Sequence, residues 1–248
     1  MDKGFHRWFA RKFLITKLTS VSIMRFALIS EGPSEHRIIK HIVAKFFKDE
    51  DPEINPIQPR LISGKQDQTT PGGWNEVLKY CEGDELQDIM VENDYLVIQI
   101  DTDQSQTAPF NISHSNTDNT QKLDIDLYSD VIEKMKSLIK QEIKDTYPDQ
   151  IIFAICIHTI ECWLIPIYYT NIHKTKTLNC LRTLNDALRK KDIHIITQEN
   201  KNEPNGIKAY DAVLKNWKKK QDISKSAQHN IGFKKFIESL GTIEAFKS

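Results

Sequence analysis

Short apolar runs alternate with helical apolar spacings along the chain from residue 24 onward. Residues 26–30, 95–100 and 151–157 are nearly continuous apolar runs with the length of buried strands, and residues 60–63 form a further strand candidate. The run at 95–100 is apolar at almost every position, which predicts a strand covered on both faces. The pattern therefore predicts a four-stranded sheet.

The segments between these strands have helical spacing. Pro33 and Ser34 open a helix over 33–47, because proline favours the first helical turn. Residues 74–81 and 126–145 predict two more helices, whereas the polar stretch 104–121 is too long for an ordinary connection and is expected to be mobile or functional. The apolar positions of the first helix are Ile38, Ile39, Ile42, Val43, Phe46 and Phe47.

Strands separated by helices predict an α/β fold with right-handed crossovers and a mostly parallel sheet flanked by helices. We place this core at residues 24–170. The pattern then becomes helical, at 178–188, 207–220 and 233–240, which predicts a C-terminal helical subdomain over 171–248, acting as a cap or partner region. Residues 1–23 form a basic extension without the features of a secretory signal, and whether Met24 is the native start stays open.

Composition supports a folded globular chain and adds an asymmetry of charge. The 248 residues are 39% hydrophobic and 27% charged, and 34 basic residues balance 34 acidic ones. Residues 82–103 hold eight acids and no Lys or Arg, whereas 208–235 hold eight lysines against Asp211 and Asp222. An acidic centre beside a basic surface suits a site for cations and then a polyanion, although two solvated faces of opposite sign would show the same pattern.

The remaining composition excludes several classes of protein. The longest apolar run, 151–157, is far too short to span a membrane. The four cysteines are too widely spaced for a zinc motif, so free thiols in a reducing cytoplasm are expected, and the eight histidines show no ligand spacing.

Acidic residues stand at or just beyond the carboxyl ends of three predicted strands. They are Glu31, Asp101 with Asp103, and Glu161. Ligands bind beyond these strand ends in parallel sheets. Crowded carboxylates repel one another and need a cation, and Mg²⁺, for which Mn²⁺ can substitute, prefers oxygen ligands and serves phosphodiester chemistry.

Two motifs resemble those of a known family. Ile29-Ser30-Glu31-Gly32-Pro33-Ser34-Glu35 resembles the strand-Glu-Gly turn of TOPRIM domains, and Ile98-Gln99-Ile100-Asp101-Thr102-Asp103 resembles their Asp-x-Asp turn. The resemblance covers roughly residues 24–165 and implies a Rossmann-like TOPRIM domain, similar to the nucleases of the overcoming-lysogenization-defect family. The resemblance to those nucleases implies a second acid four residues after the first, which Glu35 matches. It also implies a Ser-x-Glu motif after a later strand, which Thr159-Ile160-Glu161 matches with threonine in place of serine. No Walker A motif precedes the domain, so the resemblance is to standalone TOPRIM proteins, which look like phage-defence effectors, some working beside a separate ATPase.

The resemblance implies metal ligation by Glu31, Glu35, Asp101, Asp103 and Glu161, with Glu35 at the rim, and catalytic roles for Glu31, Asp101 and Asp103. Glu31 and Glu35 could instead stabilise the following helix, and the aspartates could form an Asx turn. For a lysine at the scissile phosphate, Lys208 is preferred over Lys65, Lys215 and Lys225. Lys218, Lys219 and Lys220 could bind a nucleic-acid backbone or form a solvated helix end.

These features favour a cytoplasmic Mg²⁺-dependent endonuclease acting on DNA or RNA, the effector of a bacterial anti-phage system. A separate ATPase partner and a homo-oligomer are further expectations, and no membrane partner is expected. The alternative is a non-catalytic TOPRIM-fold module that binds nucleic acid or protein, because a fold alone does not fix a function.

Overall fold

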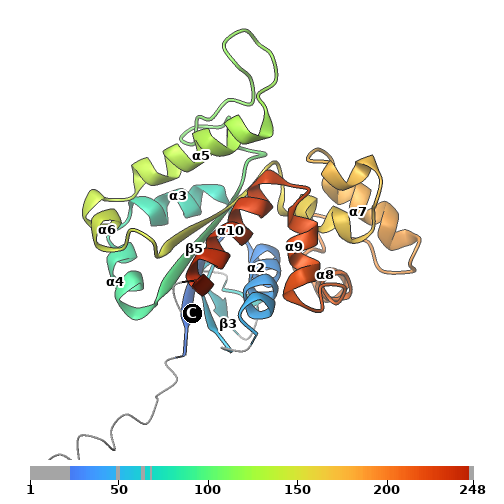
Figure 1. The fold of residues 1–248 in the computed structure, drawn as a ribbon, viewed down its shortest axis with the longest axis horizontal. Coiled ribbons are helices and arrows are strands. Elements are labelled where there is room, and N and C mark those ends of the chain that lie inside the picture. Colours follow the sequence, from blue (N-terminus) through green and yellow to red (C-terminus); the bar gives the residue numbers. More distant parts are fainter. Residues whose placement is uncertain (1–22, 49–50, 63–64, 68, 246–248) are drawn as a thin grey trace, which may run out of the picture.

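The computed structural model describes residues 23–48, 51–62, 65–67 and 69–245 (Figure 1). The basic extension predicted at 1–23 therefore lies, except for Ile23, outside the described residues. Within these ranges, no helix combines the length and the apolar character that crossing a membrane requires.

Four parallel strands form the central sheet, in the order β2-β1-β5-β6. They are β1 (Arg25–Ile29), β2 (Glu53–Gln58), β5 (Tyr95–Asp101) and β6 (Ile151–Cys156). The central strands β1 and β5 are buried along almost their whole length, as continuous apolar runs predict. The predicted α/β class with a parallel four-stranded sheet is confirmed.

The second strand of the chain does not lie where the sequence pattern placed it. The main-sheet strand is β2, whereas Leu61–Ile62 (β3) pairs with Lys65–Gln66 (β4) in a separate antiparallel ribbon. Pro56 argues against a strand because it has no N–H to donate, but β2 is an edge strand, where a missing donor is tolerated. The prediction of a main-sheet strand at 60–63 is therefore wrong.

Helices cover both faces of the sheet (Figure 1). On one face lie α3 (Trp74–Glu82), α4 (Glu85–Glu92), α5 (Asp124–Leu138) and α6 (Gln141–Thr146). The other buried core contains α2 (Pro33–Phe46), the 3-10 helix η1 (Ile160–Ile167), α7 (Cys180–Arg189), α8 (Pro204–Leu214), α9 (Lys220–Ala227) and α10 (Ile231–Ala245). The short 3-10 helix η2 (Ile172–Thr175) joins η1 to α7.

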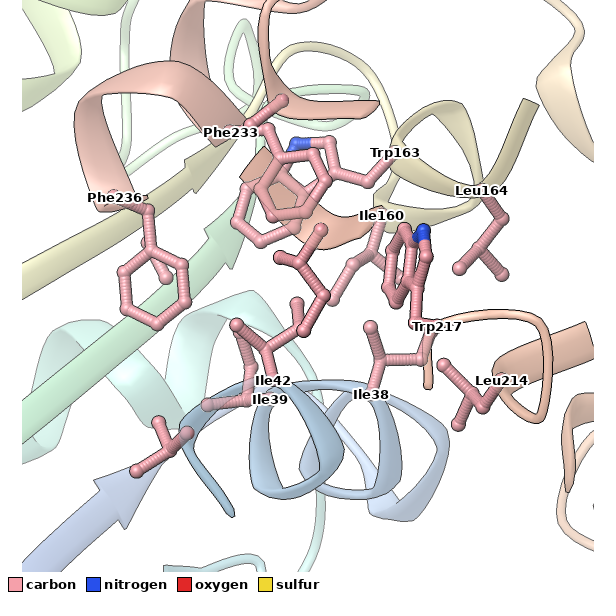
Figure 2. Packing of buried hydrophobic residues seen from close by; sticks show 14 of the residues in the cluster. Ile38, Ile39, Ile42, Ile160, Trp163, Leu164, Leu214, Trp217, Phe233 and Phe236 are labelled. Atoms are coloured by element: carbon pink, nitrogen blue, oxygen red, sulfur yellow. The ribbon is translucent and has the colours of Figure 1, made fainter. Parts of the chain in front are cut away.

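The C-terminal helices share one buried core with α2 and the sheet. Trp163 of η1 stacks on Phe233 of α10, with ring centroids 4.5 Å apart, and Trp217 lies 5.4 Å from the same ring. Ile38 and Ile42 of α2 lie beneath these rings in Figure 2. Two ion pairs bring the polar segment before α8, and α8 itself, to the N-terminal half of α2: Lys201 with Glu35, and Asp211 with Arg37.

A disulfide joins Cys162 of η1 to Cys180 of α7. The expectation of four free thiols is wrong for this pair, while Cys81 and Cys156 are free and buried. A wide sequence separation does not reveal that η1 and α7 pack side by side. Because disulfides persist in oxidising environments, the cysteines no longer argue for a reducing compartment.

Gly232, near the start of α10, allows that helix to pack directly on β6. A Cβ atom at Gly232 would lie 1.9 Å from the carbonyl oxygen of Ile155, so the helix would have to move. We expect Gly232→Ala to lower the free energy of unfolding by about 2 to 3 kcal/mol. Chemical denaturation measures the change.

Gly241 provides the matched control in the same helix, because no atom of the described residues lies within 4 Å of a Cβ added there. Gly241→Ala is expected to raise the free energy of unfolding by about 0.5 to 1 kcal/mol, since alanine restricts the unfolded chain more than glycine does. Equal stabilities for the two variants would contradict the close packing of α10 on β6.

Candidate metal centre

Five acidic side chains gather at the carboxyl edge of the sheet. Glu31 follows β1 by two residues, Asp101 ends β5, and Asp103 begins the next turn. Glu35 lies in the first turn of α2, and Glu161 lies in η1 after β6. Parallel strands bring their carboxyl ends to one edge, so residues far apart in the sequence meet here.

Glu31 and Asp101 are in direct contact. The Glu31 Oε1 atom accepts a hydrogen bond of 2.6 Å from the backbone N–H of Asp101. Gln99 completes the link, because its Oε1 accepts from the backbone N–H of Glu31 at 3.2 Å and its Nε2 donates to Asp101 Oδ1 at 2.8 Å. The ends of β1 and β5 are therefore joined through the side chains of the site.

Glycines make room for this turn. A Cβ at Gly72 would lie 2.5 Å from the carbonyl oxygen of Glu31, which accepts from the N–H of Gly73 at 2.7 Å. A Cβ at Gly32 would lie 2.6 Å from Glu35 Oε2. The loop before α3 thus packs closely over Glu31, and Gly32 leaves space for the Glu35 carboxylate.

Burial and like charge raise the pKa of the central acids. Burial raises the pKa of Glu31 to about 8, and the charges of Glu35 and Asp103 add to the effect. The pKa of Asp101 lies well above its ordinary value, first through burial and then through Glu31, Glu35 and Glu161. These carboxylates are close enough to resist ionising together.

Asp103 lies at the exposed outer side of the cluster. Its backbone N–H donates to the carbonyl oxygen of His158 at 3.1 Å, and the backbone N–H of His158 donates to Thr102 Oγ1 at 2.7 Å. Loss of solvent raises the pKa of Asp103, while hydrogen bonds from Gln104 oppose the rise. The turn after β5 is therefore fixed to the turn after β6.

Glu35 is buried and not at the rim, so that expectation is wrong. Only 2% of the residue is exposed, and Ser34 Oγ donates to Glu35 Oε2 at 2.8 Å. The helix turns Glu35 toward the interior because the core face of α2 includes this position. Asp103 occupies the outer position instead.

Lys201 is the lysine that the structure brings to the acids, and the sequence reasoning missed it. Its Nζ lies 3.7 Å from Glu35 Oε1. Its pKa is raised, first by Glu35 and also by Glu161, Asp101 and Glu31. Lys201 stands in a polar segment without periodicity, so no local signal identified it. Lys208, the residue preferred from sequence, is exposed on α8 and is found in no contact with the acids.

Tyr210 of α8 is the second residue that sequence reasoning missed. Its hydroxyl is fully buried and donates to Glu161 Oε1 at 2.6 Å. Burial and the neighbouring Glu161 raise the pKa of Tyr210 well above its ordinary value, so the phenol stays protonated. In the sequence it resembles any apolar helix position, and only the packing of α8 reveals its role.

The lysine run lies away from the acids. Lys220 Nζ is 3.9 Å from the ring centroid of Phe46, at the C-terminal end of α2. At about 1.5 Å per residue, this position is about 16 Å along the helix from Glu35. Lys218 and Lys219 are exposed next to it. The run can therefore contact only a distant part of any polymer held at the acids.

No family model, curated protein or solved structure matches this chain. The resemblance to TOPRIM domains thus rests on the two motifs and on the chemistry of the site.

The donor atoms suit a hard cation, but their present arrangement does not form a finished metal site. Within the part of the chain that the structure describes, no three His, Cys, Asp or Glu side chains are grouped so that they could hold a metal ion. Glu31, Glu35 and Glu161 instead accept hydrogen bonds from Asp101, Ser34 and Tyr210. Mg²⁺ prefers carboxylate oxygens as ligands. Because these carboxylates already accept hydrogen bonds inside the protein, the binding of Mg²⁺ would require their side chains to turn.

The raised pKa of Glu31 predicts that stability falls as pH rises. The pKa of Glu31 is about 8 in the folded state and 4.5, its ordinary value, in the unfolded state, so the folded state binds the proton more tightly. Its contribution to the stability of the folded state is therefore fully present below about pH 4.5 and is lost as the pH rises through about 8. We expect the Tm without divalent metal to be lower at about pH 8.5 than at about pH 7. Mg²⁺ should raise the Tm more at the higher pH, because it replaces protons.

One variant separates the Glu31 carboxyl group from other titrating side chains. Burial lowers the pKa of His36 to about 4 and also lowers that of His41, so these rings oppose the trend only near and below their ordinary value of 6.5. Glu31→Gln should flatten the dependence between about pH 7 and 8.5. An equally steep dependence in this variant would assign the effect to other groups.

Proposed function

We propose that the protein is a Mg²⁺-dependent nuclease in which the acidic cluster acts on phosphodiester bonds of DNA or RNA. The observation that carries the proposal is the meeting of five carboxylates from separate elements at the carboxyl edge of the sheet, with Lys201 as the cation beside them. Such crowding of carboxylates is costly without a cation. Mn²⁺ is the expected substitute for Mg²⁺.

Glu31, Asp101 and Asp103 are the residues proposed to hold the metal, with Glu35 and Glu161 behind them. When bound, the metal would stabilise negative charge on phosphate oxygens. Before a metal binds, Glu31 can carry a proton near neutral pH, because burial raises its pKa to about 8. The role of Glu31 in general acid/base work is proposed from the resemblance to TOPRIM nucleases.

Lys201 and Tyr210 position the outer carboxylates. Lys201 offsets the charge of Glu35, and Tyr210 fixes the orientation of Glu161 by its hydrogen bond. Lys201, with 27% of its side chain exposed, can also contact a phosphate oxygen of the substrate. It replaces Lys208 in our proposal for the lysine near the scissile phosphate.

A non-catalytic module is the second candidate, and one observation favours it. Among the described residues, no three potential ligands are grouped as a metal site, and several carboxylates are already satisfied by hydrogen bonds inside the protein. A module that binds nucleic acid or protein would need no metal.

The cellular role is a further part of the proposal and rests on the resemblance to standalone TOPRIM proteins. In this proposal the protein is an anti-phage effector in the cytoplasm. It works beside a separate ATPase and associates with further copies of itself. Co-purification tests for the ATPase partner, and measurement of the native mass tests for self-association.

The test uses the purified full chain with plasmid, single-stranded DNA and total RNA, in Mg²⁺, Mn²⁺ or EDTA. We expect metal-dependent cleavage of at least one substrate and its loss in Glu31→Gln. Glu133→Gln, at an exposed position of α5, is the matched control and should retain activity. Binding of nucleic acid without cleavage in any metal would support the module instead.

A further inference from the structure

A cavity of about 510 Å³ lies on the outer side of α2, away from the acidic cluster. Its walls come from α2, the edge strand β2 with its neighbour β1, β3, and α8. Pro33, Arg37, Lys40 and Ala44 line it at helical spacing, so they share one face of α2. Glu35 points to the opposite face, where it meets Lys201. The cavity is therefore separate from the site described above.

The walls of the cavity are largely apolar, with positive charge among them. The apolar lining includes Leu28, Ile54, Pro56, Leu61 and Leu214. Such a volume with apolar walls and a few polar groups is typical of small-molecule sites.

Three cationic side chains line the same cavity. Arg37 is held by Asp211 of α8, with 2.8 Å between Nη1 and Oδ1. For Lys40 and Lys45, no hydrogen bond or ion pair is found among the described residues, so their charges are available to a ligand. Among the described residues of the lining Asp211 is the single acid, so the local balance of charge is positive.

His36 contributes a buried polar atom to the wall. Its Nε2 lies 2.7 Å from the carbonyl oxygen of Gln58, which can only accept, so Nε2 carries the hydrogen. Its Nδ1 is buried and has no hydrogen-bond partner in the described part of the chain. A buried nitrogen without a partner is costly, and because solvent does not reach this atom, a ligand with an N–H or O–H group would satisfy it only after a small movement of the cavity wall.

We infer that this cavity binds a nucleotide, with the heterocyclic base between the apolar walls and the phosphate at Lys40 and Lys45. A bare inorganic anion would gain nothing from the apolar walls, and an acyl chain would offer no donor to His36. A nucleotide has a flat body, polar N–H groups and a phosphate, and so matches all three features. The ligand is either a free mononucleotide or one nucleotide of a single strand.

Calorimetric titration of the full chain tests the inference and distinguishes the sources. The ligands are a 5′-mononucleotide, the nucleoside, ribose 5-phosphate, inorganic phosphate and a single-stranded oligonucleotide. We expect saturable mononucleotide binding that the nucleoside and ribose 5-phosphate do not match. Tighter binding of the oligonucleotide through the same residues would support the site and identify a strand as its source.

Two variants localise the binding. Ala44→Leu places a larger side chain in the cavity, and the double variant Lys40→Ala with Lys45→Ala removes both available charges; each should weaken binding at least about tenfold. Lys136→Ala, at an exposed site on α5, should change it less than about twofold. Circular dichroism confirms folding, and the lysine positions lie at the surface, so the double variant remains informative if Ala44→Leu does not fold.

The inference is overturned by an absence of saturable binding at millimolar concentration, by equal affinity for inorganic phosphate, or by unchanged affinity in the folded variants. None of these outcomes depends on nuclease activity, because Lys40, Ala44 and Lys45 lie outside the acidic cluster.

Discussion

Asp101→Asn is expected to reduce metal-dependent cleavage by about 100- to 1000-fold while the fold stays intact. The change keeps the shape of the side chain and the Oδ1 atom that accepts from Gln99. It removes an ionisable group whose pKa is raised first by burial and then by the charges of Glu31, Glu35 and Glu161. Without metal the variant should be as stable as the wild type or more stable, whereas a neutral amide is a poor ligand for Mg²⁺.

A paired measurement checks this expectation: cleavage across metals, and thermal melting with and without Mg²⁺. Asp88→Asn, at an exposed position of α4, removes the same charge outside the site and should change neither. Full activity of the Asp101 variant would remove Asp101 from the proposed catalytic set. If the variant unfolds, its carboxylate is structural and the binding module becomes the better proposal.

Lys201→Ala is expected to lower the free energy of unfolding by about 2 kcal/mol at neutral pH and to reduce cleavage. Loss of one partner from a fully buried ion pair costs about 3 to 5 kcal/mol. The smaller value applies here because 27% of the Lys201 side chain is exposed and its Nζ lies 3.7 Å from Glu35 Oε1. Because its pKa is raised, Lys201 stays charged throughout the neutral range, and its contribution is lost only above its ordinary pKa of 10.5.

Lys208→Ala is the matched control, since it removes an exposed lysine a few residues away and should change stability by less than about 0.5 kcal/mol. At about 2 to 4 °C per kcal/mol for a chain of this size, thermal melting separates the two variants. The loss in Lys201→Ala should shrink at low pH, where the carboxylates are protonated. Equal effects of the two substitutions would show that Lys201 does not stabilise the acids.

The sequence by itself determined the frame of the site. The apolar runs identified β1, β5 and β6, and Pro33 marked the start of α2. Because carboxyl ends of parallel strands meet at one edge, the positions of Glu31, Asp101 and Glu161 followed from the order of the elements alone. Burial of a strand and the direction of a parallel sheet are encoded locally, by which residues are apolar and in what order they occur.

Only the tertiary structure decided which side chains meet those acids. Pro56 argues against a strand at Glu53–Gln58, because proline has no N–H to donate. The structure shows that this segment is the edge strand β2, where a missing donor is tolerated. Lys201, Tyr210 and the bond between Cys162 and Cys180 depend on where the C-terminal helices pack against η1 and α2. The residues in these contacts are not related by any helical or strand spacing in the sequence. The sequence of a helix determines which of its faces is buried, whereas the packing of the whole core determines which elements that face contacts.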